Sequence, residues 1–202
     1  FLMRIAYIIT WNLSHNDGVT RKVLRQVQEW KDLGHEVQVF CATEKKGENI
    51  PGVHFFIKDH VWSSPLAAIR NRKVYSSLCD AVVNYQPDLV YLRWEFHKKS
   101  LNKLMNQIPT VIEINTLFKG EFKRRSRENW IEFIRYWYYL MTHNKFNKSS
   151  SGFVSASKEI LELGGYYETK KPCSFIPNSI PISENQETVS YSKPQSGIPR
   201  LV

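Results

Sequence analysis

The chain has 202 residues, 42% of them hydrophobic, which is enough for one folded domain with a buried core. Its 28 lysines and arginines against 19 acidic residues give a formal net charge of +9, which favours nucleic acid, anionic lipid or phosphorylated small molecules as partners, although solubility alone would also explain it. Three widely spaced cysteines form no disulfide or metal pattern and suit a reducing cytoplasm, and no apolar run approaches the roughly 20 residues of a membrane span.

The first 40 residues predict a strand, a loop, a helix and a second strand. The apolar run Ile5–Ile9 is too short for a helix and suits a buried strand. From Val19 to Leu33 apolar residues recur at helical spacing, and Gly34 then stands where a left-handed helix end is wanted. Because Val37–Phe40 begin a second strand, the unit is expected to be a parallel crossover.

The rest of the chain continues this alternation. Further strands are predicted at 53–57, 89–92, 111–114, 152–155 and 173–176. Helices are predicted from Pro65 to Tyr85 with Ile69 on the buried side, over 99–108, and over 158–163 with Ser157 as a cap. We therefore expect an α/β fold, a Rossmann-like, doubly wound, mostly parallel sheet with helices on both faces.

The last 20 residues differ in composition from the rest. Residues 183–197 are polar and lack periodicity, which is typical of a linker, and 198–202 resemble the start of a strand. We expect residues 1–182 to form one domain, and 183–202 to be an interdomain linker and the start of a second domain.

The loop after the first strand is the first candidate site, because ligands of parallel sheets bind beyond the carboxyl ends of the strands. Gly18 stands at the entry to the first helix, where the missing Cβ lets backbone N–H groups approach an anion, and Arg21 can add a phosphate contact. Alternatively, Gly18 only permits a turn and Arg21 is solvated. The chain has no G-x-G-x-x-G and no P-loop, so no nicotinamide or ATP cofactor is expected.

Two other strand ends carry polar or aromatic side chains. Arg93, Trp94, Glu95 and His97 follow the strand at 89–92. Glu113 lies in the strand at 111–114 and Asn115 follows it, so these residues are candidates by position. A tryptophan beside charged groups is a common sugar platform, but Trp94 could equally be core and Arg93 could pair with an acid. The sequence has no Ser/His/Asp, Cys/His or metal-ligand spacing, so we assign no catalytic side chain and no metal.

The segment 118–148 is basic and aromatic. It holds eight lysines or arginines, three glutamates and nine aromatic residues. This composition suits an anionic membrane surface or single-stranded nucleic acid. A helix that packs its aromatic residues on the sheet and exposes its charges is the third interpretation.

Seven segments, in order along the chain, resemble motifs of a known family: 3–8, 17–19, 33–39, 87–91, 109–115, 153–157 and 176–180. Together they resemble the N-terminal domain of group 1 (family 4) glycosyltransferases of the GT-B fold. The resemblance implies an enzyme that transfers a sugar from a nucleotide-sugar, with retention and without a metal, to a cell-surface polysaccharide or glycolipid precursor.

The family also implies a division of labour. Its N-terminal domain holds the acceptor, and its C-terminal domain, which would begin near Ile198, holds most of the nucleotide-sugar and an E-x7-E motif. Residues 1–202 alone are then expected to be inactive. The partners would be the nucleotide-sugar, a saccharide or lipid-linked acceptor and an anionic membrane surface contacted by 118–148, with the enzyme cytoplasmic and peripheral at the inner face of the membrane.

The family motifs assign possible roles to residues that occupy the same motif positions in this sequence. Gly18 matches the second glycine of a Gly-Gly loop whose backbone meets the donor diphosphate, and Asp17 stands in place of the first. Arg93 matches a position of acceptor contact. Asn115 stands where many members have a histidine, which favours hydrogen bonding over proton transfer. The alternative functions are a non-catalytic scaffold of the same fold and a basic-aromatic nucleic-acid-binding domain; nucleic acid is not the expected partner.

Overall fold

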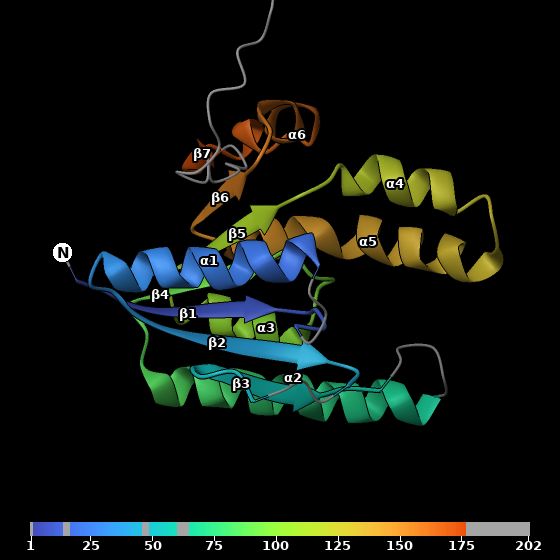
Figure 1. Cartoon of the computed structure of the whole chain (residues 1–202). Helices are drawn as coiled ribbons and strands as arrows, with labels where there is room; N and C mark the ends of the chain where they lie inside the picture. The colour runs from blue at the N-terminus through green and yellow to red at the C-terminus, as the bar shows by residue number, and fades with distance from the viewer. Residues whose placement is uncertain (1, 14–16, 46–48, 60–64, 177–202) are drawn as a thin grey trace, which may run out of the picture.

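A computed structural model describes residues 2–13, 17–45, 49–59 and 65–176, which form a seven-stranded sheet flanked by helices (Figure 1). Neighbouring strands are all parallel, in the order β3-β2-β1-β4-β5-β6-β7. The strands are β1 (Arg4–Ile9), β2 (Glu36–Thr43), β3 (Val53–Ile57), β4 (Leu89–Arg93), β5 (Thr110–Ile114), β6 (Gly152–Ser155) and β7 (Cys173–Phe175). The expected Rossmann-like α/β fold is confirmed.

The helices begin and end where local chemistry favours it. They are α1 (Gly18–Asp32), α2 (Pro65–Tyr85), α3 (Lys99–Met105), α4 (Phe118–Arg125), α5 (Trp130–Ser149), α6 (Lys158–Leu163) and the 3-10 turn η1 (Tyr167–Thr169). The Asp17 carboxylate accepts the Thr20 N–H at 2.8 Å and caps α1. Gly34 follows the end of α1 with φ 91°, the left-handed conformation predicted for it.

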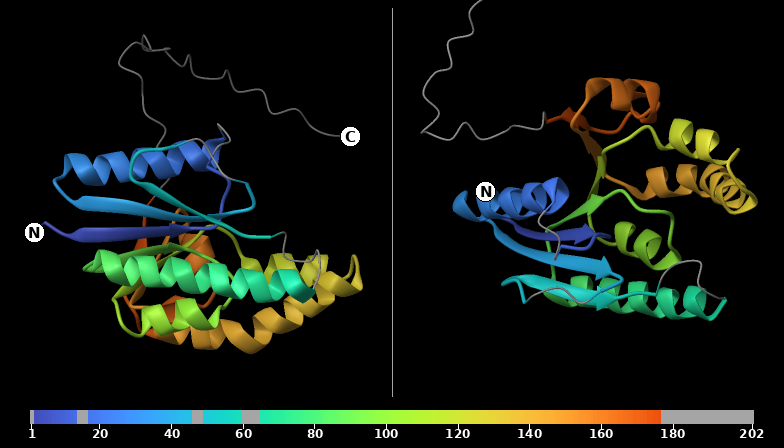
Figure 2. Two further views of the ribbon diagram at one scale, coloured as in Figure 1. Left: turned by 90° about the horizontal axis from the view of Figure 1, so that it is seen from below. Right: turned by 45° about the vertical axis from the view of Figure 1, so that its right-hand side comes forward.

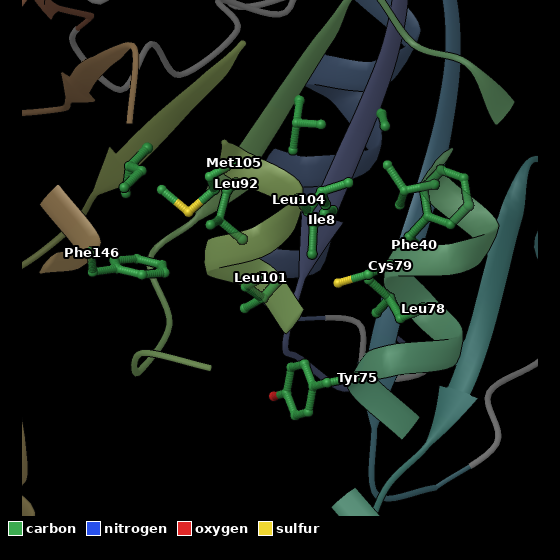
Figure 3. Packing of buried hydrophobic residues seen from close by; sticks show 14 of the residues in the cluster. Ile8, Phe40, Tyr75, Leu78, Cys79, Leu92, Leu101, Leu104, Met105 and Phe146 are labelled. Atoms are coloured by element: carbon green, nitrogen blue, oxygen red, sulfur yellow. The ribbon is translucent and has the colours of Figure 1, made fainter. Parts of the chain in front are cut away.

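The sheet is covered on both faces (Figure 2). Alternate residues of a strand point to opposite faces, so Tyr7 and Val39 pack against Val23 and Val27 of α1, while their sequence neighbours face the other way. On that second face, Figure 3 shows Ile8 and Leu92 pointing toward residues of α2 and α3. Both faces are thus buried, which explains the nearly continuous apolar runs of the central strands.

Three helix predictions need correction or refinement. Ile69 is 58% exposed, whereas Asn71 of α2 is buried, because the Asn71 amide bonds both the N–H and the carbonyl of Asp59 and fixes the rotation of the helix. The helix predicted over 99–108 ends at Met105, because the chain then turns toward β5. Ser157 is the N-cap residue of α6, but its hydroxyl donates to the Glu159 carboxylate instead of accepting a backbone N–H.

Helices α4 and α5 lie side by side and extend past the carboxyl edge of the central strands (Figures 1 and 2). Phe122 and Tyr139 join them, with ring centroids 5.3 Å apart. The interpretation that this segment packs its aromatic residues inward holds for a few rings, such as the buried Tyr139. It fails for Trp130 and Trp137, which are 70% and 57% exposed.

The carboxyl end of α5 is held by one side chain. The Lys171 ammonium donates to the carbonyl oxygens of Asn147 at 2.8 Å, Lys148 at 2.7 Å and Ser150. The last carbonyl oxygens of a helix lack the usual partners in a following turn, so a cation is well placed there; the Asn147 oxygen also accepts the Ser150 N–H at 3.3 Å. Lys171 therefore ties the segment that enters β7 to the end of α5.

The linker expected at 183–197, the strand at 198–202 and the boundary at 182 lie outside the described residues. Within the described ranges, no helix is both long enough and apolar enough to span a bilayer.

Candidate functional site

The carboxyl edge of the sheet brings together side chains from β1, β4, β5 and α1 on the α1 face. Arg93 and Glu113 are register partners on β4 and β5 and therefore point to the same face of the sheet. Glu113 is 1% exposed. The Tyr7 hydroxyl donates to one of its oxygens at 3.0 Å, and the Lys22 ammonium of α1 donates to the other at 2.7 Å.

The electrostatics of this cluster are self-consistent. Burial, and then the neighbouring Glu113 carboxylate, raise the pKa of Tyr7 well above its ordinary value, so the phenol keeps its proton and donates. Sequence reasoning selected Arg93 and Glu113 by their position at strand ends. It missed Tyr7 and Lys22, because each looks like an ordinary strand or helix residue until the fold places it opposite Glu113.

Arg93 carries the one clear sign of an unmet interaction in this cluster. Its Nη1 atom is buried and has no hydrogen-bond partner among the described residues. Buried polar atoms are usually satisfied, and leaving one unsatisfied costs roughly 1–3 kcal/mol. Arg93 as a whole is half-buried at the end of β4, so its guanidinium is a candidate contact for a bound anion or hydroxyl group.

The first turn of α1 already has a carboxylate, that of Asp17, bound to one of its N–H groups. Gly18 is exposed, and no atom lies within 4 Å of the position of a Cβ added there, so the backbone is open to a ligand. The Asp17 carboxylate, however, accepts the N–H of Thr20 and the indole N–H of Trp11 at 3.0 Å. The bond from Thr20 holds the pKa of Asp17 below its ordinary value, so a negative charge caps this helix end. Arg21 is exposed one turn into the helix.

The two remaining candidates lie elsewhere. Trp94 points to the opposite face from Arg93, where its ring stacks on Phe118 with centroids 3.5 Å apart and planes 20° apart. Phe118 thus covers one face of the indole, and a role for Trp94 as a sugar platform stays a prediction. Asn115 is half-buried directly after β5. The fold therefore groups Arg93 and Glu113, but not all six candidates.

A second polar cluster lies at the end of β4 on the other face of the sheet. Glu95 accepts the Tyr75 hydroxyl at 3.2 Å and the backbone N–H of Phe96 at 2.9 Å, and its other neighbour is the Lys98 ammonium at 3.5 Å. Burial raises the pKa of Glu95, but Lys98 and hydrogen bonding with Thr10 outweigh it and hold the value below the ordinary one. Glu95 is therefore a fixed anion.

Glu95 lines a cleft of about 640 Å³ between α2, the loop after β4, and α5. The lining carries five cationic side chains and this single carboxylate: Lys58, Arg72, Lys98, Lys99 and Arg135. Its apolar wall comes from the α5 residues Ile134 and Tyr138. Burial, and then nearby lysines, lower the pKa of His97, which also lines the cleft. Sequence reasoning noted Glu95 and His97 by position but missed the contributions of α2 and α5, which have no local signal.

A third feature is a cleft of about 750 Å³ between the α4–α5 pair and the α6–η1 region, lined mostly by polar residues. Within the described ranges, no group of three or more His, Cys, Asp or Glu side chains could hold a metal ion. The three cysteines are free thiols.

The chain matches no protein-family profile and no curated protein. Among solved structures it resembles a protein assigned as a UDP-N-acetylglucosamine 2-epimerase from Listeria monocytogenes, with a TM-score of 0.54 and 12% identity, over 85% of this chain and 44% of that one. It also resembles an alpha-glucosyltransferase in complex with UDP-glucose and DNA containing an abasic site, with a TM-score of 0.51 and 16% identity, over 87% of this chain and 42% of that one.

At these identities the likeness shows the fold alone, a Rossmann-like domain of the kind that GT-B glycosyltransferases contain. The chain spans less than half the length of either structure. The narrower resemblance to group 1 (family 4) enzymes stays a prediction from the sequence motifs.

Proposed function

We propose that this chain is the acceptor-side domain of a retaining glycosyltransferase, which transfers a sugar from a nucleotide-sugar to a cell-surface polysaccharide or glycolipid precursor. The observation that carries the proposal is the cleft beside Glu95, at the carboxyl edge of a Rossmann-like sheet. The ordered family motifs support the same assignment. The reaction would take place in the cytoplasm, with the enzyme at the inner face of the membrane.

The acceptor is proposed to bind in this cleft. A fixed carboxylate accepts hydrogen bonds from sugar hydroxyl groups, and Glu95 is held in place by Tyr75 and Lys98. The surrounding cations would favour an acceptor that also carries negative charge.

The donor diphosphate is proposed to approach the other face, near Gly18, Arg21 and Arg93, with most of the nucleotide-sugar held by a C-terminal half. The Lys22–Glu113 pair would brace α1 there, and Asn115 would bond the acceptor or the transferred sugar. Catalysis would be electrostatic: N–H groups at the start of α1 and the nearby cations stabilise the departing diphosphate.

Asp17 offers a direct test of the diphosphate site, because its carboxylate competes with an incoming anion for the same N–H groups. Replacing Asp17 by Gly should strengthen UDP or GDP binding severalfold, and it should cost only roughly a few tenths of a kcal/mol in stability, because glycine is itself tolerated at a helix N-cap. Asp17→Asn keeps a capping oxygen but removes the charge, and should give an intermediate affinity. If calorimetry shows unchanged nucleotide affinity in both variants, the diphosphate does not bind at α1.

The transfer reaction is tested on the full-length protein with a panel of UDP-, GDP- and other nucleotide-sugars. We expect slow release of nucleoside diphosphate from at least one of them. No turnover and no binding across the panel would refute the enzyme assignment. Glycan binding without nucleotide-sugar binding would instead support a scaffold of the same fold.

A further inference from the structure

Helix α5 exposes a stripe of large apolar side chains. Trp130, Phe133, Trp137 and Met141 are 70%, 57%, 57% and 58% exposed. At about 100° per residue these four positions fall on one side of the helix, opposite the buried Tyr139. Single exposed apolar residues are normal on a protein surface, but a continuous stripe of this kind marks a contact surface.

The α4–α5 pair that carries this stripe has an excess of cations. The three glutamates of 118–148 are all engaged in ion pairs with Arg124, Arg125 or Arg135. Five other cations of the segment are then left without an acid inside it: Lys119, Lys123, Arg127, Lys145 and Lys148. The α4–α5 pair therefore presents apolar side chains within a surplus of positive charge.

The stripe is continuous with the cleft beside Glu95. Ile134 and Tyr138 are 40% and 39% exposed on the neighbouring side of α5, and both also line the cleft. Arg72 and Lys99, which are exposed residues of α2 and α3, line it as well. A partner that covers the stripe thus meets the cationic cleft at its border.

The chemistry of the stripe selects among partners. Two copies of this chain would repel each other, because both would bring a positively charged surface to the contact. Nucleic acid bases stack on aromatic rings, but Met141 in the stripe and Ile134 and Leu140 beside it offer no ring for stacking. Exposed tryptophans and aliphatic side chains on a basic helix pair are together the composition of a lipid interface.

We propose that the stripe of α5 rests in the interfacial layer of a bilayer containing anionic phospholipid, and that the adjoining cleft receives the phosphate of a lipid headgroup. The second half of this proposal rests on the proposed function: the acceptor is then a phosphate-bearing lipid that enters the cleft from the membrane. Trp130 and Trp137 anchor the helix, while Arg72 and Lys99 pair with the phosphate.

Vesicle sedimentation tests the bilayer contact. The 202-residue chain should co-sediment with phosphatidylcholine vesicles that contain phosphatidylglycerol, and less with phosphatidylcholine alone. Trp137→Ser should weaken binding to both kinds of vesicle about tenfold, because the variant lacks one aromatic side chain that the bilayer would bury. Leu33→Ser is the matched control: Leu33 is 71% exposed but lies at the amino edge of the sheet, so binding should not change.

The cleft is tested with a charge variant. Arg72→Gln should weaken binding to the anionic vesicles about fivefold and leave binding to neutral vesicles unchanged. Lys31→Gln, at the far end of α1, removes the same charge away from the cleft and should have little effect. Both residues are exposed, so circular dichroism should show folded protein for each variant.

Three results would overturn the proposal: equal recovery with neutral and anionic vesicles, no effect of Trp137→Ser, or an effect of Arg72→Gln no larger than that of Lys31→Gln. Salt-sensitive binding of a single-stranded oligonucleotide without vesicle binding would assign the surface to nucleic acid. A dimer that Trp137→Ser dissociates would assign it to a second copy. Vesicle binding is measured without nucleotide-sugar, so its failure is separate from failure of the transfer assay.

Discussion

The two faces of the sheet carry the same three side-chain types at the carboxyl edge. On the α1 face, Glu113 contacts a tyrosine hydroxyl and a lysine, and on the opposite face Glu95 does the same with Tyr75 and Lys98. The surroundings differ, because Glu113 is sealed beneath α1 while Glu95 lines an open cleft. The same chemistry thus fastens a helix at one position and remains available to a ligand at the other.

The largest expected loss of stability comes from changing Glu113, which is sealed beneath α1 with Tyr7 and Lys22. Glu113→Gln keeps the shape but removes the charge that Lys22 and Tyr7 contact, and it should lower the free energy of unfolding by about 2 kcal/mol. Urea denaturation measures this. A loss no larger than that of Glu95→Gln would contradict the distinction between the sealed and the open cluster.

Glu95→Gln should cost less, about 1 kcal/mol at pH 7, because water reaches this cluster. The folded-state pKa of Glu95 is lowered, so its charge stabilises the fold at neutral pH. This contribution should be lost as the pH falls below about 4.5 toward the lower folded-state value. Urea titrations of both proteins from pH 7 to the acid limb should show the difference shrinking; a constant difference would contradict the assignment.

Removing the tyrosine hydroxyl from each cluster should have a smaller effect on stability than removing the carboxylate charge. Tyr7→Phe leaves a buried carboxylate oxygen without its donor and should cost about 1 kcal/mol, whereas Tyr75→Phe should cost less, because solvent in the cleft can replace the lost bond. Thermal unfolding of the two variants checks the order. The reverse order would indicate that the cleft is closed to water.

The last comparison uses the reactivity of the three cysteine thiols and needs no substitution. Each face holds one buried cysteine, and burial raises the pKa of both Cys41 and Cys79 to about 11. A thiol reagent at pH 7 should therefore label half-buried Cys173 first. Faster labelling of Cys41 than of Cys79 would show that the α1 layer opens more readily than the α2–α3 layer.

Most of the fold was predictable because a parallel sheet buried on both faces leaves short apolar runs such as Ile5–Ile9. The end of α1 was also predictable, because Gly34 adopts the left-handed conformation that commonly follows a helix. The sequence misled at Ile69, because helical spacing cannot reveal that an asparagine, Asn71, takes the inward position through two bonds to Asp59.

The site was only half predictable. Arg93 and Glu113 were selected because parallel strands end at a common edge, which depends on topology alone. Lys22, the partner of Glu113, and Tyr75 in the second cluster depend on how helices pack, and helical spacing alone assigns no such contact. The exposure of Trp130 and Trp137 has the same origin, because composition cannot say which way an aromatic helix faces.

The contacts of Lys171 join two parts of the molecule that the sheet does not connect directly. One ammonium group bonds the last carbonyl oxygens of α5 and belongs to the segment that enters β7, the outermost strand of the sheet. The end of α5 and the outer edge of the sheet are therefore expected to shift together.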